Sequence, residues 1–226
     1  MTQINLAQFT DLFPWIIPPE KWQASRYNVA PTQPVAAAVN HALARIEYLL
    51  WGLIPSWAGD PAIGATMINA RAETLAQKRS FARCLKRRRC LIPTSGFYEW
   101  RADPGGRKAP MFIRMKDEKP FALAGLWDVW HGPEGSQVTS CTVITTAPNE
   151  LVKAIHDRMP AIVPPEEYRL WLSPQEGDPA ALLRLLGPYP ADNMQASEVS
   201  TRVNNVRFDD PQCLEPASRD QGMLFG

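Results

Sequence analysis

The chain has 226 residues, which suits one domain or at most two small ones. Hydrophobic residues make up 45% and charged residues 21%, as in an ordinary globular protein, and the 22 prolines favour many turns over long helices. The net charge of +1 excludes a uniformly basic nucleic-acid-binding surface, so any such binding requires a local patch.

The cysteines, histidines and apolar runs exclude further classes of protein. The four cysteines form no C-x-x-C pair and the three histidines are scattered, so we expect no metal and no other cofactor. The first residues lack the basic and apolar regions of a signal peptide, and no apolar run is long enough to cross a membrane. We therefore expect a cytoplasmic protein with free thiols and no membrane partner.

The first half of the chain alternates apolar runs with loops rich in proline. Apolar residues at helical spacing predict helices, and uninterrupted apolar runs predict strands. The expected elements are a helix at residues 5–13, a loop at 14–25, strands at 35–40 and 46–51, a loop at 55–66 and a helix at 73–89.

The second half is richer in strands, and short helices follow them. Strands are expected at residues 90–94, 97–100, 111–115, 121–130, 138–146 and 195–199. Residues 116–119 are typical of a hairpin turn between two of these strands. Short helices are expected from Asn149 to near His156, from Pro165 to Trp171 and at residues 179–186 after the capping residue Asp178. The mixture predicts an α+β fold, without the alternating βαβ order or the glycine-rich loop of a nucleotide-binding sheet.

Four short segments place polar residues in otherwise apolar surroundings. They are residues 26–32, 67–73, 96–100 and 155–160. A carboxylate and an imidazole such as Glu99 and His156 suit proton transfer. Arginines suit phosphate contacts, and exposed tryptophans suit stacking on bases. The residues alone therefore indicate an acid–base site with anion contacts.

Each of these residues also has a purely structural interpretation. Asn69 can cap the helix expected after it, and Glu99 can face solvent from a strand. His156 can end a helix, where a cation is favourable. The tryptophans can be core residues, and the basic run at residues 86–89 is either a solvated helix end or a contact to a DNA backbone.

These segments, in this order, resemble the SOS-response-associated peptidase (SRAP) family. The matching motifs are Arg-Tyr-Asn-Val-Ala-Pro (26–31), Trp-Gly-Leu-Ile-Pro-Ser-Trp (51–57), Ile-Asn-Ala-Arg-Ala-Glu (68–73), Gly-Phe-Tyr-Glu-Trp (96–100), Ile-His-Asp-Arg-Met-Pro (155–160) and Val-Asn-Asn-Val (203–206). The resemblance implies a single α+β domain over residues 1–216. It also implies a central, mostly antiparallel, barrel-like sheet flanked by short helices, and we expect a disordered tail at 217–226.

The resemblance also implies a function in the SOS response and DNA repair. Members of the family bind single-stranded DNA and react with the open-chain aldehyde of an abasic site, forming a covalent protein–DNA cross-link. The nucleophile is an N-terminal cysteine, whose amine condenses with the aldehyde and whose thiol then closes a thiazolidine ring. The peptidase or hydrolase activity in the name is interpreted mainly as self-removal of the initiator Met. We expect a monomer.

The resemblance assigns roles to individual residues. Asn69 is expected to orient the N-terminal amine, and Glu99 to act as acid and base in ring opening and Schiff-base formation. His156 is expected to help open the sugar ring and to assist reversal of the cross-link. The expected DNA contacts are Arg71, Arg158, Trp100, Trp57, Asn28, Pro31 and Thr145.

The chain departs from the family at its N-terminus. The family begins Met-Cys-Gly-Arg-Phe, whereas this chain begins Met1-Thr2-Gln3. A start site placed downstream, a trimmed sequence or a true loss of Cys-Gly-Arg-Phe would each produce this difference. We expect the chain as printed to form no thiazolidine, because Cys90 and Cys141 lie in apolar strands and are expected to be inert. Two alternatives remain: a non-catalytic single-stranded-DNA-binding module and an unrelated acid–base hydrolase.

Overall fold

Five strands rich in apolar residues close into a ring at the centre of the molecule. A computed structural model describes residues 1–19, 21–41, 44–103 and 105–217, so the expected tail lies outside the described residues except for Ala217. The strands of the ring pair in the order β7–β4–β1–β2–β8 and back to β7. They are β1 (Pro34–Val39), β2 (Arg45–Trp51), β4 (Arg89–Thr94), β7 (Phe121–His131) and β8 (Gln137–Thr146). All pairs are antiparallel except β2 with β8, which confirms the mostly antiparallel, barrel-like sheet.

Side chains that point alternately to the two faces of the ring form two separate hydrophobic clusters. In β7, Leu123 and Trp127 belong to one cluster, whereas Ala124 and Leu126 belong to the other. Successive side chains of a strand point to opposite faces, so one cluster fills the ring and the other lies between its outer face and the helices. The outer cluster includes Phe9 of α1, a helix that begins after a capping box at Asn5.

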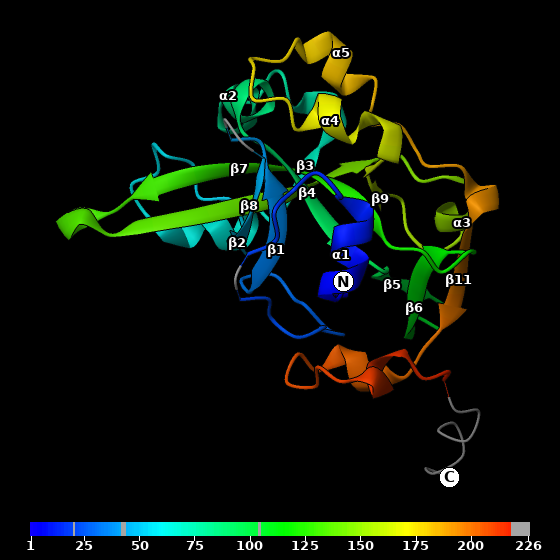
Figure 1. The fold of residues 1–226 in the computed structure, drawn as a ribbon. Helices are drawn as coiled ribbons and strands as arrows, with labels where there is room; N and C mark the ends of the chain where they lie inside the picture. Colours follow the sequence, from blue (N-terminus) through cyan, green and yellow to red (C-terminus); the bar gives the residue numbers. More distant parts are fainter. Residues whose placement is uncertain (20, 42–43, 104, 218–226) are drawn as a thin grey trace.

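Short helices and strands complete the domain (Figure 1). The helices are α1 (Leu6–Leu12), α2 (Arg79–Arg87), α3 (Glu150–Lys153), α4 (Tyr168–Trp171) and α5 (Pro179–Leu183). Three short strands extend the large sheet, namely β3 (Asn69–Arg71), β9 (Met159–Pro160) and β10 (Ile162–Val163). None of the helices in the described residues is long and apolar enough to cross a membrane.

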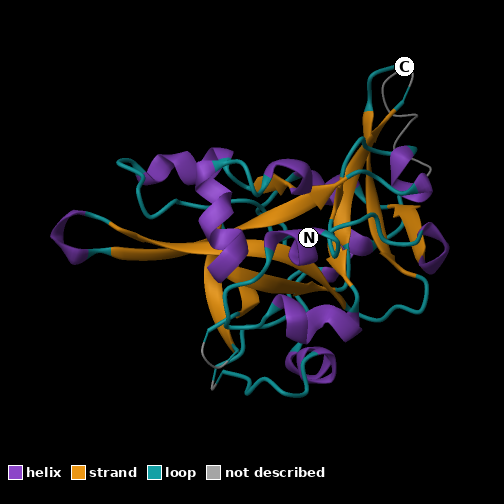
Figure 2. Ribbon diagram, turned by 90° about the horizontal axis from the view of Figure 1, so that it is seen from above, coloured by secondary structure: helices purple, strands orange, loops and turns teal. Residues whose placement is uncertain are grey.

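A second, three-stranded sheet lies beside the ring. Its order is β11–β6–β5, from β5 (Phe97–Ala102), β6 (Lys108–Met115) and β11 (Met194–Glu198). On the opposite side, β7 and β8 project as a long arm whose tip is the short turn Pro133–Gly135 (Figures 1 and 2). The described residues thus form one α+β domain, as the sequence predicts.

Two sequence predictions are wrong. The helix expected at residues 73–89 is split into the 3-10 turn Ala72–Thr74 and α2, and Asn69 lies in β3 instead of capping a helix. Residues 116–119 form no hairpin turn, because β6 and β7 belong to different sheets. Both edges of β7 already pair with β4, β8 and β10, so β6 pairs with β5 and β11 instead.

Candidate functional site

The N-terminus is anchored at the turn between β4 and β5. The backbone N–H of Thr2 donates to the carbonyl of Gly96 at 3.1 Å, and the Thr2 hydroxyl lies 2.8 Å from that of Ser95. The α-amine of Met1 donates to the carbonyl of Val29 at 3.0 Å. Burial lowers the pKa of this amine from 8.0 to about 5, with Glu99 acting in the opposite direction. The folded environment therefore favours the uncharged form of the amine.

Glu99 and His156 share one pocket although 57 positions separate them in the sequence. The pocket has a volume of about 490 Å³, and its lining residues are Glu99, Trp100, Lys108, His156 and Asn204. Burial raises the pKa of Glu99, while His156 and the Met1 amine lower it through their positive charges. Carboxyl, imidazole and N-terminal amine are thus within electrostatic reach of one another, which favours the functional interpretation of Glu99 over a solvent-facing strand residue.

Two residues of the pocket, Lys108 and Asn204, were not among the site residues predicted from the sequence. Lys108 begins β6, in a stretch without a motif, and reaches the pocket because β6 pairs with β5. Asn204 lies in the motif at 203–206 and accepts a hydrogen bond from the indole N–H of Trp100 at 2.8 Å. This bond fixes Trp100, which is 36% exposed and so presents part of its ring to solvent.

The ring nitrogen Nδ1 of His156 has two neighbours. It accepts the backbone N–H of Arg158 at 3.0 Å. The same nitrogen lies 3.3 Å from the carboxylate of Asp157. The structural interpretation as a helix end is also accommodated, since His156 donates its backbone N–H to Val152 just after α3. A half-exposed imidazole with these contacts can take up and return a proton.

Asn69 and Arg71 lie on one face of β3. They are exposed, whereas Ala70 between them is buried, as alternation along a strand requires. Strand β3 runs parallel to β8 and places Arg71 opposite Thr145. The carbonyl of Thr145 accepts a hydrogen bond from Arg158 at 2.7 Å, so the structure brings Asn69, Arg71, Thr145 and Arg158 together at one end of β8.

Arg158 and Arg71 differ in their partners. Arg158 forms a two-pronged ion pair with Glu73 at 2.8 and 2.9 Å, and hydrogen bonding from Arg158 lowers the pKa of Glu73. The side chain of Arg158 is 20% exposed. The side chain of Arg71 makes no hydrogen bond or ion pair within the described ranges and is exposed. The guanidinium of Arg71 is therefore unengaged, whereas that of Arg158 is engaged.

The remaining predicted DNA contacts lie in two other places. Asn28 is buried, and its amide donates to the carbonyls of Val203, Asn205 and Phe208, so it holds the C-terminal segment in place. Pro31, in the same loop, is half-buried. Trp57 is 47% exposed, with the guanidinium of Arg79 stacked 5.0 Å from its ring centre, and does not line the pocket at Glu99. Its exposure argues against a core role.

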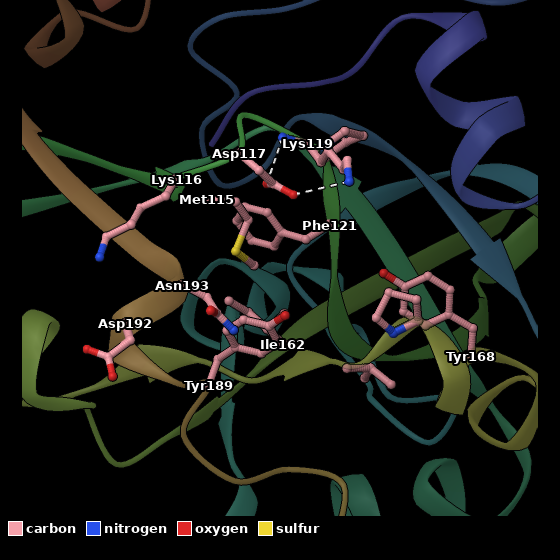
Figure 3. A pocket seen from close by; sticks show the side chains of 13 residues that line it. Met115, Lys116, Asp117, Lys119, Phe121, Ile162, Tyr168, Tyr189, Asp192 and Asn193 are labelled. Atoms are coloured by element: carbon pink, nitrogen blue, oxygen red, sulfur yellow. Dashed lines mark hydrogen bonds and ion pairs between the residues drawn. The ribbon is translucent and has the colours of Figure 1, made fainter.

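A second cavity is lined by a different set of residues (Figure 3). Its volume is about 520 Å³, with Phe121, Ile162 and Tyr168 at its apolar side and the pair Lys119–Asp117 at its rim. None of the predicted site residues lines it. Although slightly larger, it lacks a carboxyl group paired with an imidazole, so the pocket at Glu99 is the better candidate.

In the described part of the chain, neither the thiols nor a cluster of acidic and imidazole groups forms a second candidate site. All four cysteines are buried, and burial raises the pKa of Cys84 to about 12 and that of Cys90 well above its usual value. Such thiols are inert at neutral pH. Among the residues that the structure describes, no three His, Cys, Asp or Glu side chains lie close enough to hold a metal ion.

Comparison with known proteins places this geometry in a family. The sequence model of the family described as SOS response associated peptidase (SRAP) matches residues 3–206. A Bacillus subtilis relative, "Abasic site processing protein YoqW", is 45% identical over 94% of this chain and 92% of its own length. "Abasic site processing protein HMCES" from Gallus gallus is 35% identical over 74% of this chain and 56% of its own length.

The fold has solved counterparts as well. A crystal structure of a protein from Bacteroides thetaiotaomicron superposes with a TM-score of 0.72 at 31% identity, covering 80% of this chain and 81% of that one. With most of its length matched by the family and by these relatives, the chain belongs to the SRAP family.

Proposed function

We propose that this protein processes abasic sites in single-stranded DNA. The observation that carries the proposal is the pocket in which Glu99 and His156 meet beside the N-terminus. Relatives that share 45% and 35% identity are named abasic site processing proteins. An unrelated acid–base hydrolase is less well supported, because Trp100 borders the same pocket and exposed Arg71 belongs to a nearby cluster of cations.

The N-terminal residues indicate how a cysteine would enter this site. Met1 is buried in the cluster that fills the ring. In a chain that begins Cys-Gly-Arg-Phe-Thr2, the Phe would take the place of Met1, and this buried apolar environment suits it. Three further residues span about 10 Å, so they would carry a cysteine from the position of the Met1 amine towards the pocket. The chain as printed has Met1-Thr2 here, and its terminal residue offers no thiol.

The chemistry follows from these groups. The amine of the N-terminal cysteine attacks the aldehyde carbon, and loss of one water leaves an imine. The cysteine sulfur then adds to the imine carbon, and its proton ends on nitrogen, which closes the thiazolidine ring. Glu99, whose pKa is raised by burial, donates a proton to the departing oxygen. His156 moves the proton that opens the sugar ring, and Asn69 orients the amine.

The DNA strand is held by charge and stacking. Arg71 offers an unengaged guanidinium to a phosphate, and Arg158, held by Glu73 and the Thr145 carbonyl, adds its positive charge. Trp100 presents a partly exposed indole ring, fixed by Asn204, on which a base next to the lesion stacks. We assign the peptidase activity to removal of the initiator Met ahead of the cysteine, and we place a monomeric protein in the cytoplasm.

The test uses two proteins, the chain as printed and a version in which Cys-Gly-Arg-Phe replaces Met1. Each is mixed with single-stranded DNA that carries one abasic site and is analysed on a denaturing gel. We expect a shifted band for the extended protein alone, and mass spectrometry should locate the adduct on its cysteine. Glu99→Gln in the extended protein should slow its formation by about 10²-fold or more.

The controls separate chemistry from binding. Fluorescence anisotropy with the same DNA is expected to give similar affinities for the extended protein and its Glu99→Gln variant. Binding without a cross-link, in both proteins, would favour the non-catalytic binding module. No binding by either folded protein would overturn the proposal.

A further inference from the structure

Helix α2 carries a concentration of positive charge that the proposed site does not use. Of the 24 basic residues, seven fall between Lys78 and Arg89, and none of the 23 acidic residues does. The rest of the chain is therefore net negative. A local field of this kind is what a nucleic-acid-binding protein of low net charge requires.

Two of these seven cations belong to the fold. Arg89 is fully buried, and its guanidinium donates to backbone carbonyls, including those of Trp171 and Ser173. The basic run at 86–89 is therefore not simply a solvated helix end. Arg88 forms an ion pair with the buried carboxylate of Asp128. Arg88 and Arg89 therefore have structural roles. The exposed cations on α2 itself have no such role so far.

The exposed cations of α2 share one face. Arg79, Arg83 and Arg87 recur every four residues and so lie along one side of the helix, and Lys86 lies beside them. The opposite face buries Phe81, Cys84 and Leu85 against the domain. We call Arg79, Arg83, Lys86 and Arg87 the α2 cationic face.

A groove beside this face already holds an oxyanion. Its volume is about 290 Å³, and Arg83, Lys86, Arg87 and Glu176 line it. The carboxylate of Glu176 accepts hydrogen bonds from Arg87 at 2.6 and 3.1 Å and lies 3.9 Å from Lys86. Arg83 has no carboxylate within 4.0 Å in the described part of the chain. One acid thus faces three cations, and a phosphate group, with more oxygens and more charge, matches them better.

We propose that the α2 cationic face binds the sugar–phosphate backbone of the same DNA strand, several nucleotides away from the abasic site. This inference rests on the proposed function. Arg71 ends β3, and α2 begins eight residues later, so the cations continue from the site along the chain. Arg79, the first residue of the face, stacks over exposed Trp57, which adds an aromatic platform to the path.

The composition of the surface favours single-stranded DNA over an acidic protein. Exposed arginines beside an exposed tryptophan combine backbone charge contacts with base stacking, the pattern of sequence-independent single-strand binders. No hydrogen-bonding array that would read base edges is needed, since a damaged strand must be held whatever its sequence. In Figure 1, α2 lies well apart from β5 and β6, so a strand that reaches both sites must be longer than one that fills the pocket.

The test is a triple variant, Arg83→Gln, Lys86→Gln and Arg87→Gln, in the protein extended with Cys-Gly-Arg-Phe. Anisotropy is measured at several salt concentrations on abasic strands of roughly 6 and roughly 24 nucleotides. Because each phosphate contact contributes about 0.7 to the slope of log K against log salt for single strands, the slope on the long strand should fall by about 2. The short strand should bind as before.

A second variant, Glu176→Gln, acts in the opposite direction. Removing the carboxylate that competes with phosphate should tighten binding of the long strand several-fold and leave the short strand unchanged. Its cross-linking yield on the short strand should equal that of the unaltered protein.

A matched control removes three cations elsewhere, at Arg114, Lys116 and Lys119 on and after β6, and should leave the long-strand slope unchanged. Far-UV circular dichroism checks that each variant is folded. An unchanged slope in the α2 triple variant, with Glu176→Gln also without effect, would overturn this inference while leaving the proposed function standing. Failure of the unaltered extended protein to bind either strand would instead overturn the proposed function.

Discussion

At the scale of single residues, burial shifts the pKa values of the Met1 amine and Glu99 more than their charged neighbours do. The Met1 amine and the Glu99 carboxyl interact electrostatically, and this attraction alone would favour the charged form of both. Desolvation acts the other way on both groups, lowering the pKa of the amine and raising that of the acid. Both groups are therefore shifted towards their neutral forms.

The first prediction concerns the pH dependence of stability in the chain as printed. The Met1 amine has a pKa of about 5 when folded and 8.0 when unfolded, so between these values the unfolded state binds the extra proton. Stability is then full above pH 8 and falls as the pH drops to 5, by about 4 kcal/mol at most. A ¹⁵N NMR titration of the amine should show a midpoint near 5. A midpoint near 8 would contradict this account.

The pKa of Glu99 has the opposite linkage. Because its folded-state pKa is raised above 4.5, it contributes stability at low pH that is lost as the pH rises. Urea unfolding of the Glu99→Gln variant between pH 5 and 8 therefore isolates the amine. In that variant the loss of stability on acidification should be steeper than in the unaltered chain.

Arg89 provides a second prediction at this scale. Its guanidinium donates to five carbonyls, those of Leu85, Lys86, Trp171, Ser173 and Gln175. Arg89→Met leaves these acceptors without their donor and should destabilise the fold by about 3–5 kcal/mol, or roughly 10 °C in Tm. Calorimetry measures the shift. Arg87→Met, at an exposed position of the same run, should change the stability by less than about 0.5 kcal/mol, and equal effects would contradict the structural role of Arg89.

At the scale of secondary structure, the turn between β4 and β5 positions the site. Gly96 accepts the N–H of Thr2, and Glu99 follows three residues later on β5. A Cβ at Gly96 would lie 2.2 Å from the ring of Phe112 and 2.7 Å from the carbonyl of Ile113. Strand β6 approaches this turn so closely that residue 96 must be glycine.

Gly96→Ala should accordingly destabilise the protein by about 1–3 kcal/mol through overpacking. In the extended protein it should also lower the cross-linking rate, because β5 must shift and carries Glu99 with it. Gly105→Ala is the matched control, since its Cβ would meet nothing closer than the Asp103 carboxylate at 3.4 Å. Urea denaturation and the cross-linking gel measure both effects. A Gly96→Ala protein that is as stable and as reactive as the control would refute this role of the turn.

Elements with a strong local signal could be predicted from the sequence, and elements created by pairing could not. The apolar runs of β1, β2, β7 and β8 appear directly in the sequence. Strands β9 and β10 have two residues each and exist because they pair with β8 and β7. The pairing of β6 with β5 and β11 could not be predicted either. Strands adjacent in sequence usually form hairpins, and the choice of another partner depends on the whole sheet.

The same limit applies to the site. Glu99 and His156 could be selected as polar residues in apolar surroundings, and the family resemblance gave them roles. Their common pocket depends on the approach of β5 to the segment after α3, which no local pattern encodes. Lys108 had no signal at all, because it joins the pocket only through the pairing of β5 with β6.

At the scale of the whole molecule, one carboxylate ties the C-terminal segment to the start of the domain. Asp209 accepts hydrogen bonds from the Arg26 side chain at 2.7 Å and from the backbone N–H groups of Tyr27 and Asn28 at 2.6 and 2.8 Å. Burial alone would raise the pKa of Asp209, yet these three donors lower it. The segment held in this way carries Asn204, the partner of Trp100, and lies across the lower face of the domain (Figure 1).

Asp209→Ala should therefore act at a distance. It leaves a guanidinium and two N–H groups without their acceptor, at a cost of about 2–4 kcal/mol, and detaches the segment that fixes Trp100. Limited proteolysis should cut the variant between residues 199 and 214 faster than the unaltered protein. The variant should also bind single-stranded DNA several-fold more weakly, because Trp100 is no longer fixed. Asp192→Ala, at an exposed position, should change neither. If the segment stayed protected while DNA binding weakened, Asp209 would act on the DNA directly. The role of Asp209 in holding the C-terminal segment to residues 26–28 would then be refuted.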